Sequence, residues 1–322
     1  MNNKNLSLFF RILVTIGIFI ALFKFIPYQQ VFSTFKNSNK TYLLLAVLVF
    51  FPCYLIGVAR WRYLLAAQGI KSAWSDVFYA FFCGLFFNLF FPSFVAGDLF
   101  RAVSISRRYG QKKEAASSVL MDRFSGAVAL NLLALISYIF GRKYINDRSV
   151  FLTLSILTLA MIFSSLVIFS KRFFGLLARV LSAKPKLHLK IISLHDQLYF
   201  FKRKPSVFFK SLFFSFPIQI LTAAAFFITS RSFGLDVSIV YFLMVVPLIM
   251  SIALVPITIA GAGTREASAV FFFSLIGIDK NIGLGISLFN LIYMVAASIF
   301  GGILYVGIYH RRLQSYTQDK NP

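Results

Sequence analysis

Charged residues are scarce in this sequence: they make up 13% of its 322 positions, and only ten of them are acidic. Because a water-soluble domain carries roughly a quarter charged residues, this composition excludes that class. Cysteine is scarcer still, and since Cys53 and Cys83 both lie inside apolar runs, a disulfide scaffold is also excluded. Apolar side chains are abundant instead, at 59% hydrophobic with a mean hydropathy of +0.80. We infer an integral membrane protein.

The charge that is present is mostly positive, with 33 Lys and Arg and a formal net charge of +23. No aromatic and basic single-strand platform accompanies it, so nucleic acid is not expected as a partner. In a membrane protein such an excess follows from the positive-inside rule and from contact with anionic lipids. Signatures of zinc proteases, serine hydrolases, P-loops and Rossmann folds are missing, so no catalytic residue, cofactor or metal is predicted.

The apolar runs predict an all-α polytopic membrane protein. Six uninterrupted runs are long enough to cross about 30 Å of hydrocarbon: Leu6–Ile26, Tyr42–Val58, Ala115–Phe140, Val150–Ser170, Ser206–Thr229 and Ile282–Tyr309. Two more regions, 74–106 and 237–277, are broken by segments that contain glycine. Each is predicted to be a re-entrant hairpin of one helix, a break and a shorter helix.

Basic residues set the expected topology of this single domain, 1–322. If both hairpins return to their starting side, most Lys and Arg fall in cytoplasmic segments, and both termini are cytoplasmic. The first half is then 1–170 and the second half 206–309, joined by a basic cytoplasmic linker, 171–205, and followed by a tail, 310–322. The hairpins enter from opposite sides, as in inverted-repeat transporters with a site at the bilayer midplane, and we expect the plasma membrane.

Six ionisable residues are predicted within or near the hydrocarbon, where a charge costs about 2.5–3.5 kcal/mol. They are Asp98, Arg101, Asp122, Arg123, Arg265 and Glu266. One interpretation is mutual neutralisation by ion pairs that tie helices together. The interpretation that we favour is a binding site, because intramembrane ionisable groups usually serve function.

The two hairpin motifs favour an anion as the ligand. In the first, Gly97 precedes Asp98, which is expected to cap a helix that carries Arg101 on the same face. In the second, Gly261 and Gly263 permit a tight break, and Thr264 is the expected N-cap before Arg265 and Glu266. Each motif places a half-helix N-terminus and an arginine near the midplane, a combination that suits phosphate.

The roles assigned to these residues follow from charge. Arg101, Arg265 and Arg123 are predicted to bind phosphate, together with the half-helix starts at Gly97, Gly261, Gly263 and Thr264. Asp98, Asp122 and Glu266 are predicted to balance charge or couple a proton. Being adjacent, Asp122 and Arg123 point about 100° apart, so one can face the site while the other pairs with a neighbouring helix.

A third motif, Arg60-Trp61-Arg62, ends the second span. It is interpreted first as an interfacial anchor, with the aromatic ring at headgroup level, and second as a point of lipid entry.

The segment from Asn88 to Arg101, followed by Asp122-Arg123 and then Pro256 to Glu266, resembles the lysylphosphatidylglycerol synthase transmembrane region, or flippase-like domain, family. Arg60-Trp61-Arg62 is similar to an early motif of that family, and the resemblance covers essentially the whole chain. It implies movement of a lipid with a charged or sugar-bearing phosphate head between leaflets.

The chain departs from the family pattern in two ways. It ends at Pro322 without room for an aminoacyl-transfer domain, so synthesis is not implied. Ser93-Phe94-Val95-Ala96 stands where relatives often carry another basic residue, which leaves the head group open.

The leading hypothesis is therefore a translocase for an amino-acylated or glycosylated lipid with an anionic phosphate head, working beside a lipid-modifying synthase or glycosyltransferase. A membrane transferase for polyprenyl-phosphate sugars, with Asp98 or Glu266 as general base, is one alternative. The other is a scaffold that transports nothing and serves a lipid-modifying enzyme.

Overall fold

The structure is a computed structural model that describes residues 36, 38–90, 96–141, 147–180, 195–255, 258 and 261–309. Throughout these ranges the regular structure is helical, and no strand occurs in them. Five helices within them are long and apolar enough to cross a membrane. The expected all-α polytopic class is confirmed.

The five spans coincide with five of the six predicted ones. They are the nearly continuous pair α3 (Lys40–Phe50) and α4 (Pro52–Ala67), then α7 (Lys112–Gly141), α8 (Arg148–Phe169), α11 (Pro205–Ser232) and α14 (Lys280–Leu304). The last continues as a π-helical turn, Tyr305–Tyr309. The sixth predicted span, Leu6–Ile26, and the tail 310–322 lie outside the described residues.

Both interrupted regions form two separate helices. The first consists of α5 (Trp74–Phe90) and α6 (Ala96–Tyr109), and the second of α12 (Ile239–Ala253) and α13 (Thr264–Ser274). With 11 residues, α13 is about 17 Å long, so it reaches only partway through the hydrocarbon. The predicted pattern of a helix followed by a shorter helix is confirmed. The side from which each hairpin enters stays a prediction.

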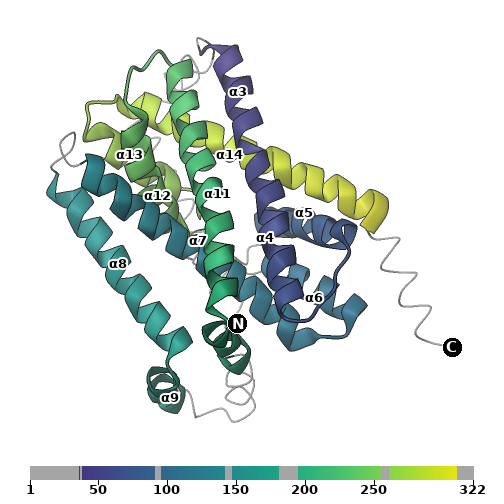
Figure 1. Cartoon of the computed structure of the whole chain (residues 1–322). Helices are drawn as coiled ribbons and strands as arrows, with labels where there is room; N and C mark the ends of the chain where they lie inside the picture. The colour runs from purple at the N-terminus through teal and green to yellow at the C-terminus, as the bar shows by residue number, and fades with distance from the viewer. Residues whose placement is uncertain are drawn as a thin grey trace, which may run out of the picture.

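The two halves pack together in a matching way. In the first half α5 contacts α6 and α6 contacts α7, while in the second half α12 contacts α13 and α13 contacts α14. Across the halves α5 contacts α14, and α12 contacts α7. Each hairpin therefore lies against the long helix that follows the other hairpin, and α4 and α11 pack side by side (Figure 1).

Glycines allow the helices around α5 to approach closely. A Cβ atom on Gly97 of α6 would overlap the backbone oxygen of Gly84, and one on Gly301 of α14 would overlap the backbone oxygen of Phe82. Gly301 of the last span thus permits close helix packing. These contacts hold α5 between α6 of the same hairpin and α14 of the second half.

The linker is described in two parts. α9 (Lys171–Val180) follows α8 after a break at Ser170, and a short helix over 195–203 precedes α11. His195 is buried: its ring stacks on Phe174 at 3.7 Å, and its Nε2 atom lies 3.2 Å from the Val167 carbonyl oxygen. The short helix is therefore held against the α8 and α9 end of the bundle.

Candidate functional site

A cavity of about 330 Å³ lies between the two halves of the molecule. Its wall takes residues from α3, α4, α5 and α7 of the first half and from α11, α12, α13 and α14 of the second. Most of the wall is apolar. The polar residues described on it are Tyr54, Arg60, Asn88, Arg123, Gln219, Thr222, Arg265, Asn290 and Ser298. Three arginines from three helices thus line one cavity.

Arg60 is buried in the protein, with 8% of its surface exposed. Its Nε atom donates to Asp122 Oδ1 at 2.7 Å, and its Nη1 atom donates to Ser215 Oγ at 2.7 Å. Trp61 is fully buried and donates from its indole to Ser118 Oγ at 3.1 Å. The prediction that these two residues anchor the protein at the lipid interface was wrong, because both side chains are buried between helices and bonded to other helices.

The third residue of that motif has a different environment. Arg62 donates from Nε to the Ser72 carbonyl oxygen at 3.1 Å, and its guanidinium lies 4.5 Å from the ring centre of Trp74. Trp74 is 54% exposed. Interfacial lipid contact therefore stays a prediction for Arg62, with Trp74 as the aromatic partner.

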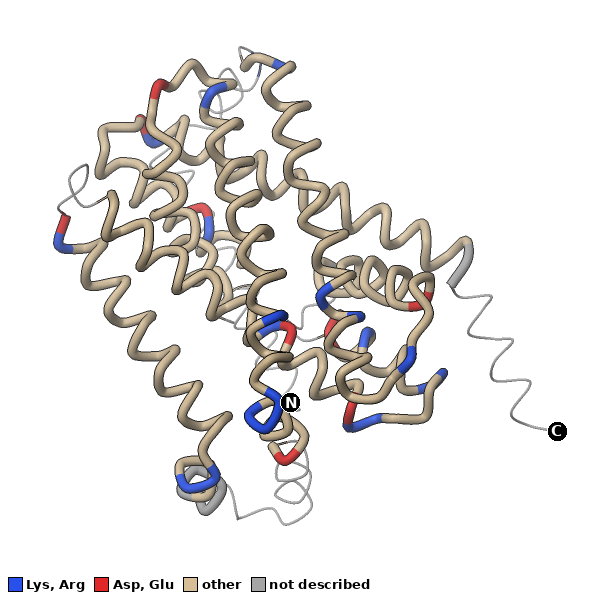
Figure 2. The backbone as a smooth tube through the Cα atoms, viewed as in Figure 1, with Lys and Arg blue, Asp and Glu red and all other residues tan. Residues whose placement is uncertain are grey.

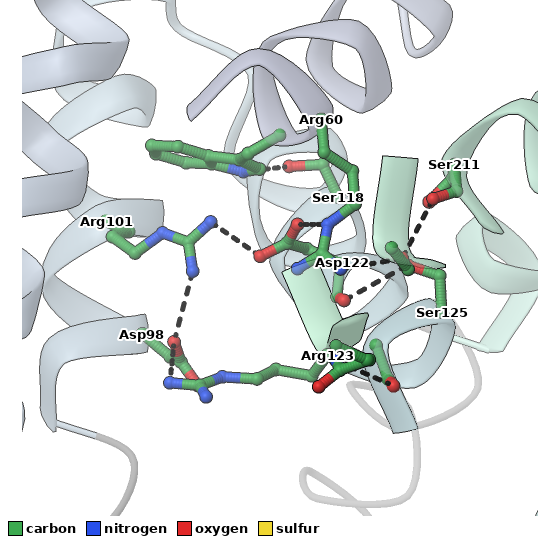
Figure 3. Close-up of polar contacts among 12 residues, drawn as sticks. Arg60, Asp98, Arg101, Ser118, Asp122, Arg123, Ser125 and Ser211 are labelled. Atoms are coloured by element: carbon green, nitrogen blue, oxygen red, sulfur yellow. Dashed lines mark hydrogen bonds and ion pairs between the residues drawn. The ribbon is translucent and has the colours of Figure 1, made fainter. Parts of the chain in front are cut away.

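Asp122 is the centre of the ion-pair network in the first half (Figure 3). One carboxylate oxygen accepts from Arg60, and the other accepts from Arg101 Nη2 at 2.9 Å. Arg101 is 4% exposed, and its guanidinium lies 4.1 Å from the ring centre of Trp61 and 4.7 Å from that of Phe81. Arg101 is not among the described cavity-lining residues, so the structure places it behind the wall, where it joins α6 to α4, α5 and α7.

Arg123, the neighbour of Asp122 in the sequence, lines the cavity and pairs with a different carboxylate, that of Asp98. Its Nε and Nη2 atoms donate to the two Asp98 oxygens at 2.8 and 3.0 Å, a bidentate pair. Its side chain is 40% exposed and lines the cavity, whereas Asp122 pairs with other helices. Asp122 and Arg123 therefore point in different directions, as expected for adjacent positions on a helix.

The first hairpin motif needs one correction. α6 begins at Ala96, two residues before Asp98, so Asp98 lies in the first turn and is not the N-cap. It still places a negative charge at the positive end of the helix, and it lies 3.5 Å from Arg101 Nη1. Gly97 donates its backbone N–H to Asn88 Oδ1 at 2.9 Å, which ties the start of α6 to α5.

The second motif also needs a correction at its cap. Gly263, with a φ of 90°, is the N-cap of α13, and Thr264 is the first helical residue. The Thr264 hydroxyl donates to the Gly261 carbonyl oxygen at 3.0 Å. Glu266 supplies the cap that Thr264 was expected to give, since its carboxylate accepts from the Gly263 N–H at 2.6 Å. Gly261, with a φ of 74°, closes the turn that brings α13 back against Ala253.

Arg265 and Glu266 form the ion pair of the second half. Nε and Nη2 of Arg265 donate to Glu266 Oε1 at 3.0 and 2.6 Å, and both residues are at most 1% exposed. Ser287 of α14 adds a donor to the same oxygen at 3.4 Å. Arg265 lines the cavity, and Glu266 is not among the described lining residues.

The charges of the site do not cancel. Four guanidiniums (Arg60, Arg101, Arg123, Arg265) stand against three carboxylates (Asp98, Asp122, Glu266), which leaves one positive charge among the described residues. The sequence predicted three arginines and three acids within the membrane, because Arg60 was expected at the lipid interface. In the structure Arg60 lies at helical spacing from the buried positions Cys53, Gly57 and Leu64, on the face of α4 that packs inside.

Sequence reasoning also missed Asn290. This residue of α14 lines the cavity, is 2% exposed, and has no hydrogen-bond partner within the described chain at either its side-chain oxygen or its nitrogen. A lone asparagine in an apolar run gives no signal by itself. Groups of three or more His, Cys, Asp and Glu able to hold a metal do not occur in the described ranges.

These features define a class: a helical, multi-pass membrane protein in which two interrupted-helix hairpins and two arginine networks enclose a cationic cavity. Residues 8–301 match the sequence profile of the family described as Lysylphosphatidylglycerol synthase TM region. The chain therefore belongs to that family, and its role is related to membrane lipids.

Comparison with individual proteins agrees with this assignment. The chain is 23% identical over 306 residues to a UPF0104 membrane protein of Methanocaldococcus jannaschii, an alignment that covers 88% of this chain and 90% of the archaeal protein. No solved structure matches the chain.

Proposed function

We propose that the protein is a lipid translocase that moves a phosphate-headed lipid between leaflets. One observation carries the proposal: Arg60, Arg123 and Arg265, from both halves of the molecule, line one cavity that holds an excess of one positive charge. A buried cation in excess of its counter-ions is costly, and an anionic ligand removes that cost.

The phosphate is the part of the lipid that fits this chemistry. Guanidinium groups match phosphate oxygens in bidentate geometry, and three of them approach the cavity from α4, α7 and α13. The three carboxylates keep the empty site close to neutral, so the helices stay together between cycles. Acyl chains remain in the bilayer while the head group crosses through the cavity between the hairpins.

The proposed orientation places both termini in the cytoplasm, in a plasma membrane. The basic start of α9 lies at the end of the bundle where α11 begins, together with the basic run at 202–204 (Figure 2). At the other end of α11, Arg231 is paired with Asp236 at 2.5 Å. Unbalanced positive charge at one end supports a cytoplasmic position for that end.

Reconstitution tests the proposal. The wild-type protein in liposomes is expected to expose an acyl-labelled fluorescent phosphatidylglycerol to an impermeant quencher faster than empty liposomes do. Arg60→Gln is expected to slow this by at least about tenfold, since a charge-assisted hydrogen bond is worth about 1.5–3 kcal/mol.

Arg62→Gln is the matched control, because Arg62 lies two positions along the same helix and contacts Ser72 and Trp74 outside the cavity. It is expected to leave the rate unchanged within about twofold. Equal rates in wild type and Arg60→Gln, both well folded, would remove the mechanism.

The two alternatives give other outcomes. Product formation from a polyprenyl-phosphate sugar by pure protein in detergent would indicate a transferase, although the bases expected for it, Asp98 and Glu266, are both held by arginines. Normal lipid asymmetry in cells that carry only Arg60→Gln would indicate a scaffold.

A further inference from the structure

The neutral polar groups of the cavity distinguish between kinds of head group. We propose that the cavity selects a phosphate lipid whose remaining head is neutral and hydroxyl-bearing, a polyol or a monosaccharide, and rejects heads that carry an ammonium group. This inference rests on the proposed function, because it names the substrate class of the same site.

The first argument is the position of the acids. An ammonium group in a buried site needs a carboxylate, and no Asp or Glu is among the described residues that line the cavity. The nearby carboxylates are occupied: Arg123 holds Asp98 in a bidentate pair, and Asp122 lies between two arginines. Glu266 accepts from Arg265 and from the Gly263 N–H.

The second argument is the sign of the charge that remains. The lining cations Arg60, Arg123 and Arg265 and the adjoining Arg101 exceed the three carboxylates by one. A phosphate neutralises this excess. An aminoacyl head would bring an ammonium group beside guanidiniums, and like charges in a desolvated site repel strongly.

The third argument is the side chain of Asn290. It is 2% exposed on the cavity wall, and within the described residues neither its Oδ1 nor its Nδ2 atom has a hydrogen-bond partner. Buried amides are normally satisfied, so an unsatisfied one in a residue that lines a cavity indicates a ligand group. A hydroxyl both donates and accepts and therefore satisfies both ends of the amide, whereas an ammonium group can only donate.

The remaining polar lining has the same neutral character. Besides the arginines and Asn290 it consists of the carboxamides of Asn88 and Gln219 and the hydroxyls of Tyr54, Thr222 and Ser298. The Thr222 and Ser298 hydroxyls donate to carbonyl oxygens of their own helices at 2.8 Å, which leaves their oxygens able to accept. At about 330 Å³ the cavity is at the small end of ligand sites, which favours a compact head.

The test compares three acyl-labelled lipids in proteoliposomes of the full chain: phosphatidylglycerol, phosphatidylinositol and lysyl-phosphatidylglycerol. The first two are expected to cross at least about tenfold faster than the lysyl lipid, because only the lysyl head adds cationic charge to a cationic site. Lysyl-phosphatidylglycerol crossing as fast as the others would overturn the inference while leaving the translocase intact. Failure of all three to cross would overturn the proposed function.

Charge placement inside the cavity gives a second readout. Asn290→Asp is expected to raise the ratio of lysyl-phosphatidylglycerol to phosphatidylglycerol transport by at least about fivefold, since it supplies the missing carboxylate. Asn131→Asp is the control, because Asn131 is on α7, is bonded to Thr158 at 3.1 Å, and does not line the cavity. Gln219→Glu repeats the test from α11 if Asn290→Asp fails to fold. An unchanged ratio in the folded cavity variants would overturn the inference.

Discussion

Arg60 and Asp122 are 62 positions apart in the chain, yet the Arg60 Nε atom donates to the Asp122 carboxylate at 2.7 Å inside the protein. The contact joins α4 to α7, and the second oxygen of the same carboxylate binds Arg101 of α6. One acid therefore serves two buried arginines. This sharing creates the positive excess of the cavity and makes Asp122 the residue on which the first half depends.

Asp122→Asn is expected to destabilise the protein by about 3–5 kcal/mol, because it leaves two buried guanidiniums without their shared counter-ion. Thermal unfolding in detergent measures the loss.

Asp236→Asn is the control for this substitution. Asp236 also pairs with an arginine, Arg231, but its side chain is 89% exposed, and such pairs contribute less than about 1 kcal/mol. Equal losses in the two variants would show that burial of Asp122 has no energetic consequence.

Gly97→Ala is expected to destabilise the first hairpin by about 3 kcal/mol, since the new Cβ would overlap the backbone oxygen of Gly84, which cannot move aside as a side chain does. Lower thermal stability and weaker protection of α6 in hydrogen exchange are the measurements. Gly175→Ala meets no atom within 4 Å and is expected to keep or slightly raise stability. Unchanged thermal stability and unchanged hydrogen exchange in Gly97→Ala would contradict the close packing of α5 and α6.

Acidification is expected to loosen the short helix at 195–203 from the bundle. Burial against Phe174 lowers the pKa of His195, an effect stronger than the opposing influence of the Val167 carbonyl and Asp196. Because the folded pKa is depressed, the folded state binds fewer protons than the unfolded state. The stabilisation is complete above about pH 6.5 and is lost as the pH falls below that value.

Limited proteolysis of the linker between pH 7.5 and 5 measures this effect. His195→Phe keeps the ring stack without a titrating group, so its cleavage is expected to be independent of pH in that range. Equal pH dependence in wild type and His195→Phe would show that His195 is not the group responsible for the effect.

Much of the fold was predictable because membrane spans are encoded locally. A run of about 20 apolar residues is sufficient to identify a span, and five of the six predicted ones are observed. The broken helices were equally visible, since the glycines at Gly97, Gly261 and Gly263 interrupt apolar runs.

The cap positions and the lining of the cavity were harder to predict. Helix boundaries shift by one or two residues when a side chain elsewhere can satisfy the first turn, as Glu266 does for α13. The positions of Arg60 and Arg101 depend on which side of α4, α6 and α7 face one another, and local sequence does not contain that information. Asn290 could not be predicted as a cavity residue for the same reason, because its place depends on which face of α14 is turned toward the other helices.

Binding of lipid phosphate by the cavity arginines is the central claim, and native mass spectrometry of the detergent-purified protein with phosphatidylglycerol tests it most directly. Arg123→Gln removes one charge from the cavity wall, and its partner Asp98 still has Arg101 within 3.5 Å. Arg231→Gln is the control, because it removes an arginine at the far end of α11. We predict saturable binding to wild type, weakened at least about tenfold by Arg123→Gln and unchanged by Arg231→Gln. Equal binding by wild type and both variants would contradict the account.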